Sequence, residues 1–275
     1  MRPAQFRKWL QTLGPVRVCL SAFFLIFLLI LFMAFSPYIH SEMQHHALIR
    51  ASKNDPNHSS PLILACYAKS LPMVQRLLDE RADTNQQNVR GFTALMIAAD
   101  FDQLEIVRLL LARGAEVKLR TKLHKTALYY AAGSRPEIIQ LLLDHGADAR
   151  SESGALECAV SADLSPNIRL LVLAGADVNE SEPSGRTVLM WAAQWTSPEN
   201  VRLLLDHGAD IHARQKDGWT ALMFACNRPK NIQVLLQHGA DPNVRDKHND
   251  SVLKMARLDG EDETVRLLKQ AGAKE

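Results

Sequence analysis

Hydrophobic residues recur along this chain in two alternating patterns, and the combined unit repeats about every 33 residues. The first pattern is a short run with a leucine at an inward position and a pair of small residues, as at Leu189 and Ala192–Ala193. The second carries apolar residues at the i, i+3, i+4 spacing of a helix with one buried face, as at Val201, Leu204 and Leu205. A glycine such as Gly208 follows and ends that helix, because glycine adopts the left-handed C′ conformation at little cost. The pattern predicts a chain of paired short helices.

The repeat can be aligned on the alanine that follows the end of each second helix. The intervals between successive alanines are 33, 32, 29, 33, 31 and 33 residues. The seven positions are Ala82, Ala115, Ala147, Ala176, Ala209, Ala240 and Ala273. One helix pair cannot bury both of its faces, so neighbouring units must stack into an elongated solenoid.

The starts of the first helices show one regularity and one exception. Thr93, Thr126, Thr187 and Thr220 precede these helices and are predicted to be their N-caps. The fourth unit has Gly154 at that position and the shortest interval, which predicts a short hairpin over residues 149–153. The terminal units are atypical, as expected for the ends of a solenoid.

The two halves of the unit, Thr-Ala-Leu-Met at 220–223 and His-Gly-Ala-Asp at 238–241, resemble the ankyrin repeat, whose period is 33. The resemblance covers residues 55–275. It implies an all-α repeat solenoid of about seven repeats, each a helix-turn-helix with a β-hairpin loop. It further implies that a partner protein binds the concave strip formed by hairpin tips and first-helix ends.

Mapping that strip onto this sequence selects twelve candidate partner-binding residues. Those at the first-helix ends are Tyr67, Asp100, Phe101, Gln194, Trp195, Asn227 and Arg228, and those at the hairpin tips are Arg90, Phe92, Lys125, Arg186 and Trp219. Tryptophan, tyrosine and arginine are typical of interface hot spots. For Phe92 and Trp219 the alternative is that each only covers the neighbouring hairpin. Trp191, Met190, Met223 and Phe224 are predicted to lie mostly in the core.

The N-terminal segment differs from the repeats. Val18 to Phe35 has no charge, and as a helix it would span about 27 Å, close to the hydrocarbon core of a bilayer. Four basic residues precede it and Pro37 ends it. We therefore expect a cytoplasmic N-terminus over 1–17, a transmembrane signal anchor over 18–36, an irregular tether over 37–54 and the repeat domain over 55–275 beyond the membrane. A cleaved signal peptide and a buried soluble helix are the alternatives, although the apolar run is long for a signal peptide.

Charge and cysteine content exclude several functions. The net charge is +2, and removing the four basic residues of 1–35 leaves 28 basic and 30 acidic residues. A nearly neutral body does not favour nucleic-acid binding. The four cysteines form no C-x-x-C pair, so no zinc or redox site is expected. Cys66, Cys158 and Cys226 are predicted to be buried small residues too far apart for disulfides.

No motif of a catalytic or phosphate-binding site is present. The recurrent aspartates (Asp83, Asp148, Asp177, Asp210 and Asp241) follow the helix ends and are predicted to be turn residues. We therefore expect no enzyme activity, cofactor, metal or small-molecule substrate. The sequence favours a membrane-tethered protein that binds another protein in the periplasm from the bacterial inner membrane, as an accessory factor or an immunity-type inhibitor. The alternatives are a cytoplasm-facing membrane adaptor and an enzyme with an unrecognised site.

Overall fold

The computed structural model describes residues 45–274, so the segments expected over 1–17 and 18–36 lie outside the described residues. The chain divides between Asn54 and Asp55 into two units. The described part of the first unit, residues 45–54, is helical, whereas an irregular tether was expected there. Within the described range, none of the helices has the length and apolar character needed to span a bilayer.

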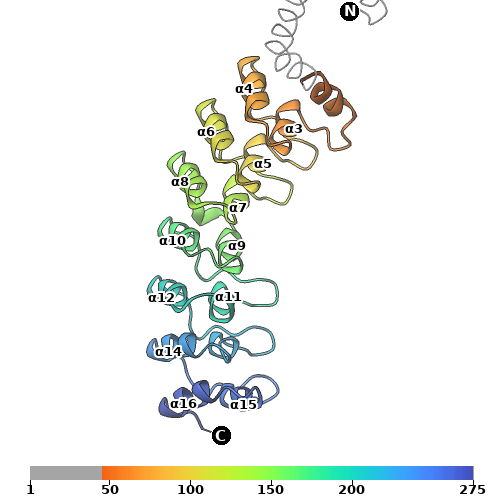
Figure 1. Ribbon diagram of the computed structural model, residues 1–275. Coiled ribbons are helices and arrows are strands. Elements are labelled where there is room, and N and C mark those ends of the chain that lie inside the picture. The colour runs from red at the N-terminus through yellow and green to blue at the C-terminus, as the bar shows by residue number, and fades with distance from the viewer. Residues whose placement is uncertain (1–44, 275) are drawn as a thin grey trace, which may run out of the picture. The chain divides into compact units, whose positions relative to one another are not determined.

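The second unit is a stack of seven helix pairs over the residues described. Figure 1 shows the first helices of the pairs in one row and the second helices in another. The first helices are α3 (Pro61–Tyr67), α5 (Ala94–Asp100), α7 (Ala127–Ala131), α9 (Ala155–Ser161), α11 (Val188–Trp195), α13 (Ala221–Phe224) and α15 (Val252–Leu258). The second helices are α4 (Leu71–Asp79), α6 (Leu104–Ala112), α8 (Pro136–Asp144), α10 (Ser165–Leu173), α12 (Pro198–Asp206), α14 (Pro229–Gln237) and α16 (Asp262–Gln270).

The core lies between the two rows and between successive pairs. Leu95, Ala98 and Ala99 of α5 are fully buried, and their counterparts in α7 and α11 are buried as well. This burial confirms the inward positions predicted for the first helices. In the second helices the prediction was partly wrong, because Leu205 is only half-buried.

Side-chain caps start most of the first helices. Thr93, Thr126 and Thr187 each accept a hydrogen bond from a backbone N–H of the first turn, at 3.2–3.4 Å. Ser60 and Ser251 do the same in the terminal repeats. Thr220 occupies the predicted N-cap position of α13 but makes no such side-chain bond.

The turns after the second helices follow the predicted chemistry. Each of the five recurrent aspartates accepts a hydrogen bond from the backbone N–H two residues later, as Asp83 does from Asn85 at 2.8 Å. The imidazole Nδ1 atoms of His145, His207 and His238 lie 2.8 Å from the carbonyl oxygen four residues earlier, at the ends of their helices. These contacts explain the recurrence of both residue types without a ligand.

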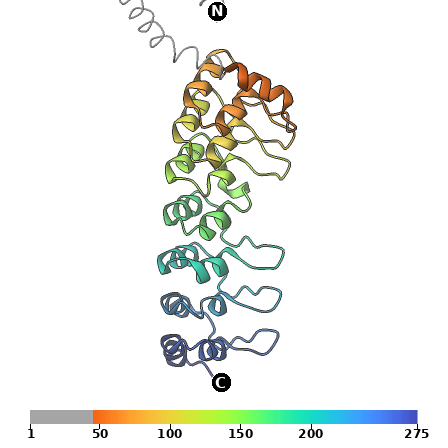
Figure 2. The ribbon, with the colours of Figure 1, turned by 45° about the vertical axis from the view of Figure 1, so that its right-hand side comes forward.

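The hairpin loops are less regular than expected. The described residues contain no β-strand, only two isolated antiparallel bridges, Ser181–Thr187 and Arg245–Ser251. Figure 2 shows the loops projecting to one side of the stack, the side of the first helices. Single backbone hydrogen bonds join most neighbouring tips, as between Lys122 N–H and the carbonyl of Arg90 at 3.0 Å.

The fourth repeat is short at its hairpin, as predicted, and replaces the missing cap with carboxylates. Its connection forms a single 3-10 turn, η2 (Ala149–Ser151), and Gly154 has a left-handed φ of +83°. Glu180 of the following hairpin accepts a hydrogen bond from the Gly154 N–H at 2.8 Å. A carboxylate therefore holds the N-cap residue of α9, whereas five of the other first helices are capped by their own Thr or Ser.

The predicted burial of the cysteines holds for one residue of the three, although all three thiols are free, as predicted. Cys66 is buried and free, and burial raises the pKa of its thiol to about 12. Cys158 and Cys226 are free but only partly buried. Their predicted role as core residues is therefore wrong.

Candidate partner-binding surface

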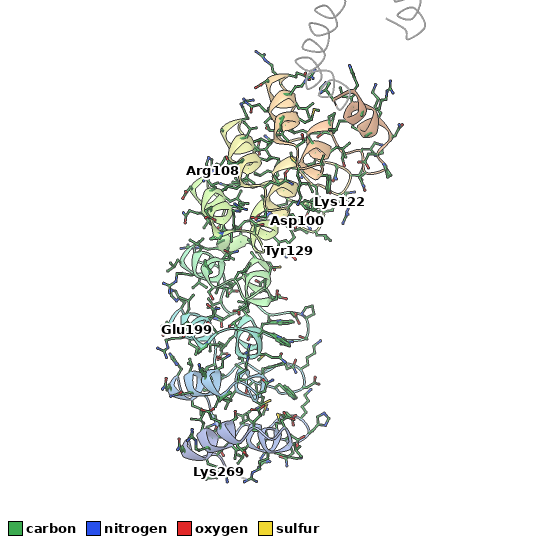
Figure 3. The ribbon with its side chains drawn as sticks, in the orientation of Figure 1. Asp100, Arg108, Lys122, Tyr129, Glu199 and Lys269 are labelled. Carbon is green, nitrogen blue, oxygen red and sulfur yellow. The ribbon has the colours of Figure 1, made fainter. Side chains whose placement is uncertain are left out.

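We define the inner surface as the side of the stack formed by the first helices and the hairpin tips. Figure 1 shows the stack bending towards this side at its N-terminal end. In Figure 3, Asp100, Lys122 and Tyr129 lie on the inner side, whereas Arg108 and Glu199 lie on the side of the second helices. The twelve candidate residues fall into two groups along the inner surface.

The first group begins with aromatic rings at the ends of the first two inner helices. Tyr67 ends α3 and is 45% exposed, and Phe101 follows α5 and is 38% exposed. Their ring centroids lie 5.8 Å apart in an edge-to-face arrangement, and the Lys69 ammonium lies 5.2 Å from the Phe101 ring. Burial raises the pKa of the neighbouring Asp100 carboxyl. The fold does not need these rings for stacking, because both stand outside the packed helix faces.

A chain of cation–π and ring contacts continues this group across the second and third repeats. The Arg90 guanidinium lies 5.3 Å from the Phe92 ring, which contacts Tyr130 at 5.1 Å. Tyr130 contacts Tyr129 at 5.3 Å, and the Lys125 ammonium lies 4.5 Å from the Tyr129 ring. Phe92 therefore bridges two repeats and also remains half-exposed.

The second group is centred on Arg186. Its guanidinium carbon lies 3.6 Å from the Trp191 ring and 4.5 Å from the Phe224 ring, and it donates a hydrogen bond to the Gln194 side chain. Burial lowers the pKa of Arg186. The Trp191 indole N–H donates to Glu182 at 3.2 Å. Arg186 and Gln194 therefore hold each other in a fixed arrangement on the inner surface.

The remaining candidates of this group connect neighbouring repeats. The Trp219 indole N–H donates to Asp246 of the next hairpin at 3.1 Å, and its ring packs on Phe224 at 5.2 Å. The Arg228 guanidinium donates to the backbone carbonyls of Gln194 and Trp195 at 3.0 and 2.7 Å. Its charge is thus committed to the end of α11. Asn227 is exposed, and Trp195 is 52% exposed.

Comparison with known proteins identifies the repeat. The family model described as "Ankyrin repeats (3 copies)" matches residues 39–121, 62–153, 114–182, 156–246 and 189–274. The chain belongs to the ankyrin repeat family. Ankyrin repeats are a protein–protein interaction module, and the match indicates no catalytic family.

Curated relatives share parts of the ankyrin region. Ankyrin repeat and SAM domain-containing protein 6 of Rattus norvegicus is 45% identical over 82 residues, which cover 26% of this chain and 9% of that protein. The B-cell lymphoma 3 protein homolog of Mus musculus is 34% identical over 148 residues, 50% of this chain and 33% of that protein. The chain thus spans a third or less of these relatives. Both come from rodents, so they lend no support to the expected bacterial source.

Solved ankyrin structures agree with the fold. The ankyrin repeat domain of human ASB11 superimposes with a TM-score of 0.67 at 22% identity, covering 79% of this chain and 100% of that one. The ankyrin repeat domain of Bcl-3, a member of the IkappaB protein family, gives a TM-score of 0.62 at 29% identity, covering 78% and 99%.

The sequence missed three aromatic residues of the inner surface. Tyr129, Tyr130 and Trp191 are half-exposed and contribute rings to the two groups, although Trp191 was predicted to lie in the core. Met190, Met223 and Phe224 are buried, as predicted. The residue types themselves were a signal. A buried tyrosine hydroxyl or tryptophan N–H needs a hydrogen-bond partner, so these side chains favour positions near solvent.

Other chemistry is sparse in the described region. Among residues 45–274 no three His, Cys, Asp or Glu side chains lie together as a metal site would require. A shallow depression lies between α12 and α14 on the side of the second helices, lined by residues of both charges such as Arg202, Asp206 and Lys230. These side chains do not converge on one chemistry.

Proposed function

We propose that this ankyrin repeat chain binds a partner protein through the inner surface. The observation that supports the proposal most strongly is the exposure of Tyr67, Phe101 and Trp195 at the ends of α3, α5 and α11. These rings lie on one side of the stack, and the stacking of the helices does not require them. Large exposed aromatic side chains beside cationic groups are typical of interface hot spots.

The two groups of candidate residues present different chemical groups to a partner. Tyr67, Phe101 and Arg90 present apolar and cationic groups from the first two hairpins and helices. Trp195 stands beside the Arg186 cluster, which supplies a rigid platform. A partner that covers both groups would span the inner surface from α3 to α13. Truncating a hot-spot aromatic typically costs about 2 kcal/mol or more of binding free energy.

Alanine variants of the full chain test this proposal. The partner is first captured by chemical crosslinking to the wild-type chain. The double variant Tyr67→Ala, Phe101→Ala and the single variant Trp195→Ala should each lower the amount of captured partner at least about tenfold. Leu173→Ala is the matched control, because Leu173 is 64% exposed but lies at the end of α10 on the opposite side. Equal recovery by all variants, with their thermal midpoints unchanged, would remove the inner surface as the binding site.

We further propose that the chain acts from a membrane, with the ankyrin domain on the non-cytoplasmic side, which in a bacterium is the periplasm. The support is the uncharged run from Val18 to Phe35 and the four basic residues before it. Alkaline phosphatase and green fluorescent protein fused in turn after Glu275 test the orientation. The proposal expects an active phosphatase and a dark fluorescent protein. The reverse result would indicate the cytoplasm-facing adaptor instead.

Once the partner is identified, its activity with and without this chain distinguishes an accessory factor from an immunity-type inhibitor. Both roles use the same binding surface. Purified partner would gain activity with the chain in the first case and lose activity in the second. Inner-surface variants should abolish either effect.

A further inference from the structure

The row of hairpin tips on the inner surface follows a simple hydrogen-bonding rule. Most tips contain one residue with positive φ, such as Gly91, His124, Gly185 or Gly218. In each such tip, the residue two positions before the positive-φ residue donates its N–H to the preceding tip. The acceptor is the carbonyl of the residue directly before the positive-φ residue of that preceding tip. For example, Lys122 lies two positions before His124 and donates to Arg90, which directly precedes Gly91. The four bonds of this type join Val89 to Asn57, Lys122 to Arg90, Lys216 to Ser184 and Lys247 to Asp217, at 2.9–3.0 Å.

The rule breaks at one place within the described residues, between the tip at 121–125 and the tip at 181–186. The intervening hairpin is the short one of the fourth repeat and forms only η2. By the same rule the carbonyl of Leu123 should accept a bond, and no described N–H donates to it. The donor position of the next full-length tip is Pro183, which has no N–H. We call this interruption the hairpin gap.

The helix residues under the gap differ from their equivalents elsewhere. Each first helix has a position three residues after its cap, and in repeats with full-length hairpins on both sides it is a buried apolar residue. The buried examples are Ile63, Met96, Met190 and Met223. In the third and fourth repeats the same position holds Tyr129 and Glu157, and both are half-exposed. The sequence thus places polar groups where the missing tip leaves the helices uncovered.

The rims of the gap carry one exposed apolar side chain and several charged groups. The Leu123 side chain on one rim is 70% exposed, and Lys122 beside it is exposed. Glu182 lies on the other rim, where it accepts from Trp191. The Glu157 carboxyl group lies within hydrogen-bonding reach of the Glu182 carboxyl group, and the Arg186 guanidinium interacts electrostatically with both. Burial and the neighbouring Glu182 carboxylate raise the pKa of Glu157, and Lys125 offsets only part of the negative charge.

We propose that an extended segment of the partner protein occupies the hairpin gap, donates a backbone N–H to the Leu123 carbonyl, and places a lysine or arginine side chain against Glu157 and Glu182. The backbone contact would continue the row of tip-to-tip hydrogen bonds, as strand addition does at an open sheet edge. The basic side chain would offset the negative charge of two neighbouring carboxylates. This inference rests on the proposed function, because it names a subsite of the same inner surface.

A displayed library of random linear peptides about 12 residues long, selected on the immobilised full chain, provides the probe. Enriched peptides should carry lysine or arginine in excess. Their affinity should fall at least about tenfold for the double variant Glu157→Gln, Glu182→Gln, which keeps side-chain volume and removes two charges. Leu123→Ala should weaken the same peptides, and the control Leu173→Ala should not.

Three results would overturn the inference. They are enriched peptides without basic residues, enriched peptides that bind the double glutamine variant as well as the wild type, and a failure to enrich any peptide. Self-association of the full chain that disappears in the double glutamine variant would also overturn it, because a second copy would then be the occupant.

The inference can fail while the proposed function stands. Suppose that the alanine variants of Tyr67, Phe101 or Trp195 lose the partner, whereas the double glutamine variant retains it. The inner surface would then remain the binding site, and the hairpin gap would be excluded as part of it. Unchanged or raised thermal midpoints of the glutamine variants would show that any loss of binding is not a loss of folding.

Discussion

Replacement of Glu152 by alanine tests how the short fourth hairpin supports its neighbour. Glu152 is the most buried acidic residue described, with its side chain 1% exposed. Its carboxylate accepts from the backbone N–H of Thr126 at 3.1 Å and from the Thr126 hydroxyl at 2.6 Å. The Arg120 guanidinium lies 3.6 Å away. The carboxylate therefore fixes the residue that caps α7.

The loss of stability expected for Glu152→Ala can be estimated from the hydrogen-bond donors that would lose their acceptor. Glu152→Ala would strand the Thr126 N–H in a buried site, at a cost of about 1–3 kcal/mol. The hydroxyl can rotate, so its loss adds the net value of one hydrogen bond to a charged group, about 1.5 kcal/mol. Together these give an expected loss of about 2.5–4.5 kcal/mol in the free energy of unfolding. Glu152→Gln keeps one acceptor and should lose about half as much.

Urea unfolding followed by circular dichroism measures this loss, provided that the transition remains cooperative. Glu116→Ala is the matched control, because Glu116 accepts one exposed hydrogen bond from Asn85 in the preceding hairpin. That control should lose less than about 0.5 kcal/mol. A Glu152→Ala variant as stable as the control would refute the idea that a buried carboxylate anchors α7.

Three further predictions concern turns and titrating groups. Gly208→Ala should lower the free energy of unfolding by about 1 kcal/mol, since only the φ of +89° opposes a side chain there. Gly91→Ala should lower it by at least about 2 kcal/mol, because its Cβ would lie 2.8 Å from the backbone of Thr121. Urea unfolding measures both, and equal losses would contradict the close approach of the tips. The hydrogen bond from Arg135 lowers the pKa of Asp102, so Asp102→Asn should lower the thermal midpoint above about pH 5, and the difference from wild type should shrink as the pH falls through the lowered pKa. The pKa of Glu157 is raised by burial and by Glu182, so Glu157→Gln should raise the midpoint at pH 7, and this gain should vanish below about pH 4; a gain that is the same at both pH values would exclude the carboxylate as its cause.

The repeat architecture could be predicted because the same burial problem is solved in every unit. Leu95, Leu128 and Leu189 recur at one position since each must fill the space between two stacked pairs, and all three are buried. Thr93 and Thr187 recur because each helix start leaves backbone N–H groups without partners. Periodicity in the sequence reflects these shared local requirements.

The details of the inner surface could not be predicted in the same way. Trp191 occupies a position that is buried as Ile97 in another repeat, but it is half-exposed and its indole N–H donates to Glu182. Arg228 was selected as a partner-binding residue at a first-helix end, but its guanidinium is held by two backbone carbonyls of the preceding repeat. Such contacts join residues 33 or 34 positions apart, and no local pattern records them.

Photo-crosslinking from single positions of the full chain is the most direct test of the claim that the inner surface binds the partner. A crosslinking amino acid would replace Phe101, Trp195 or Leu173 in turn, since all three side chains are exposed and apolar. Binding at the inner surface should give the same partner adduct from positions 101 and 195 and none from position 173. An adduct from position 173 alone would contradict it.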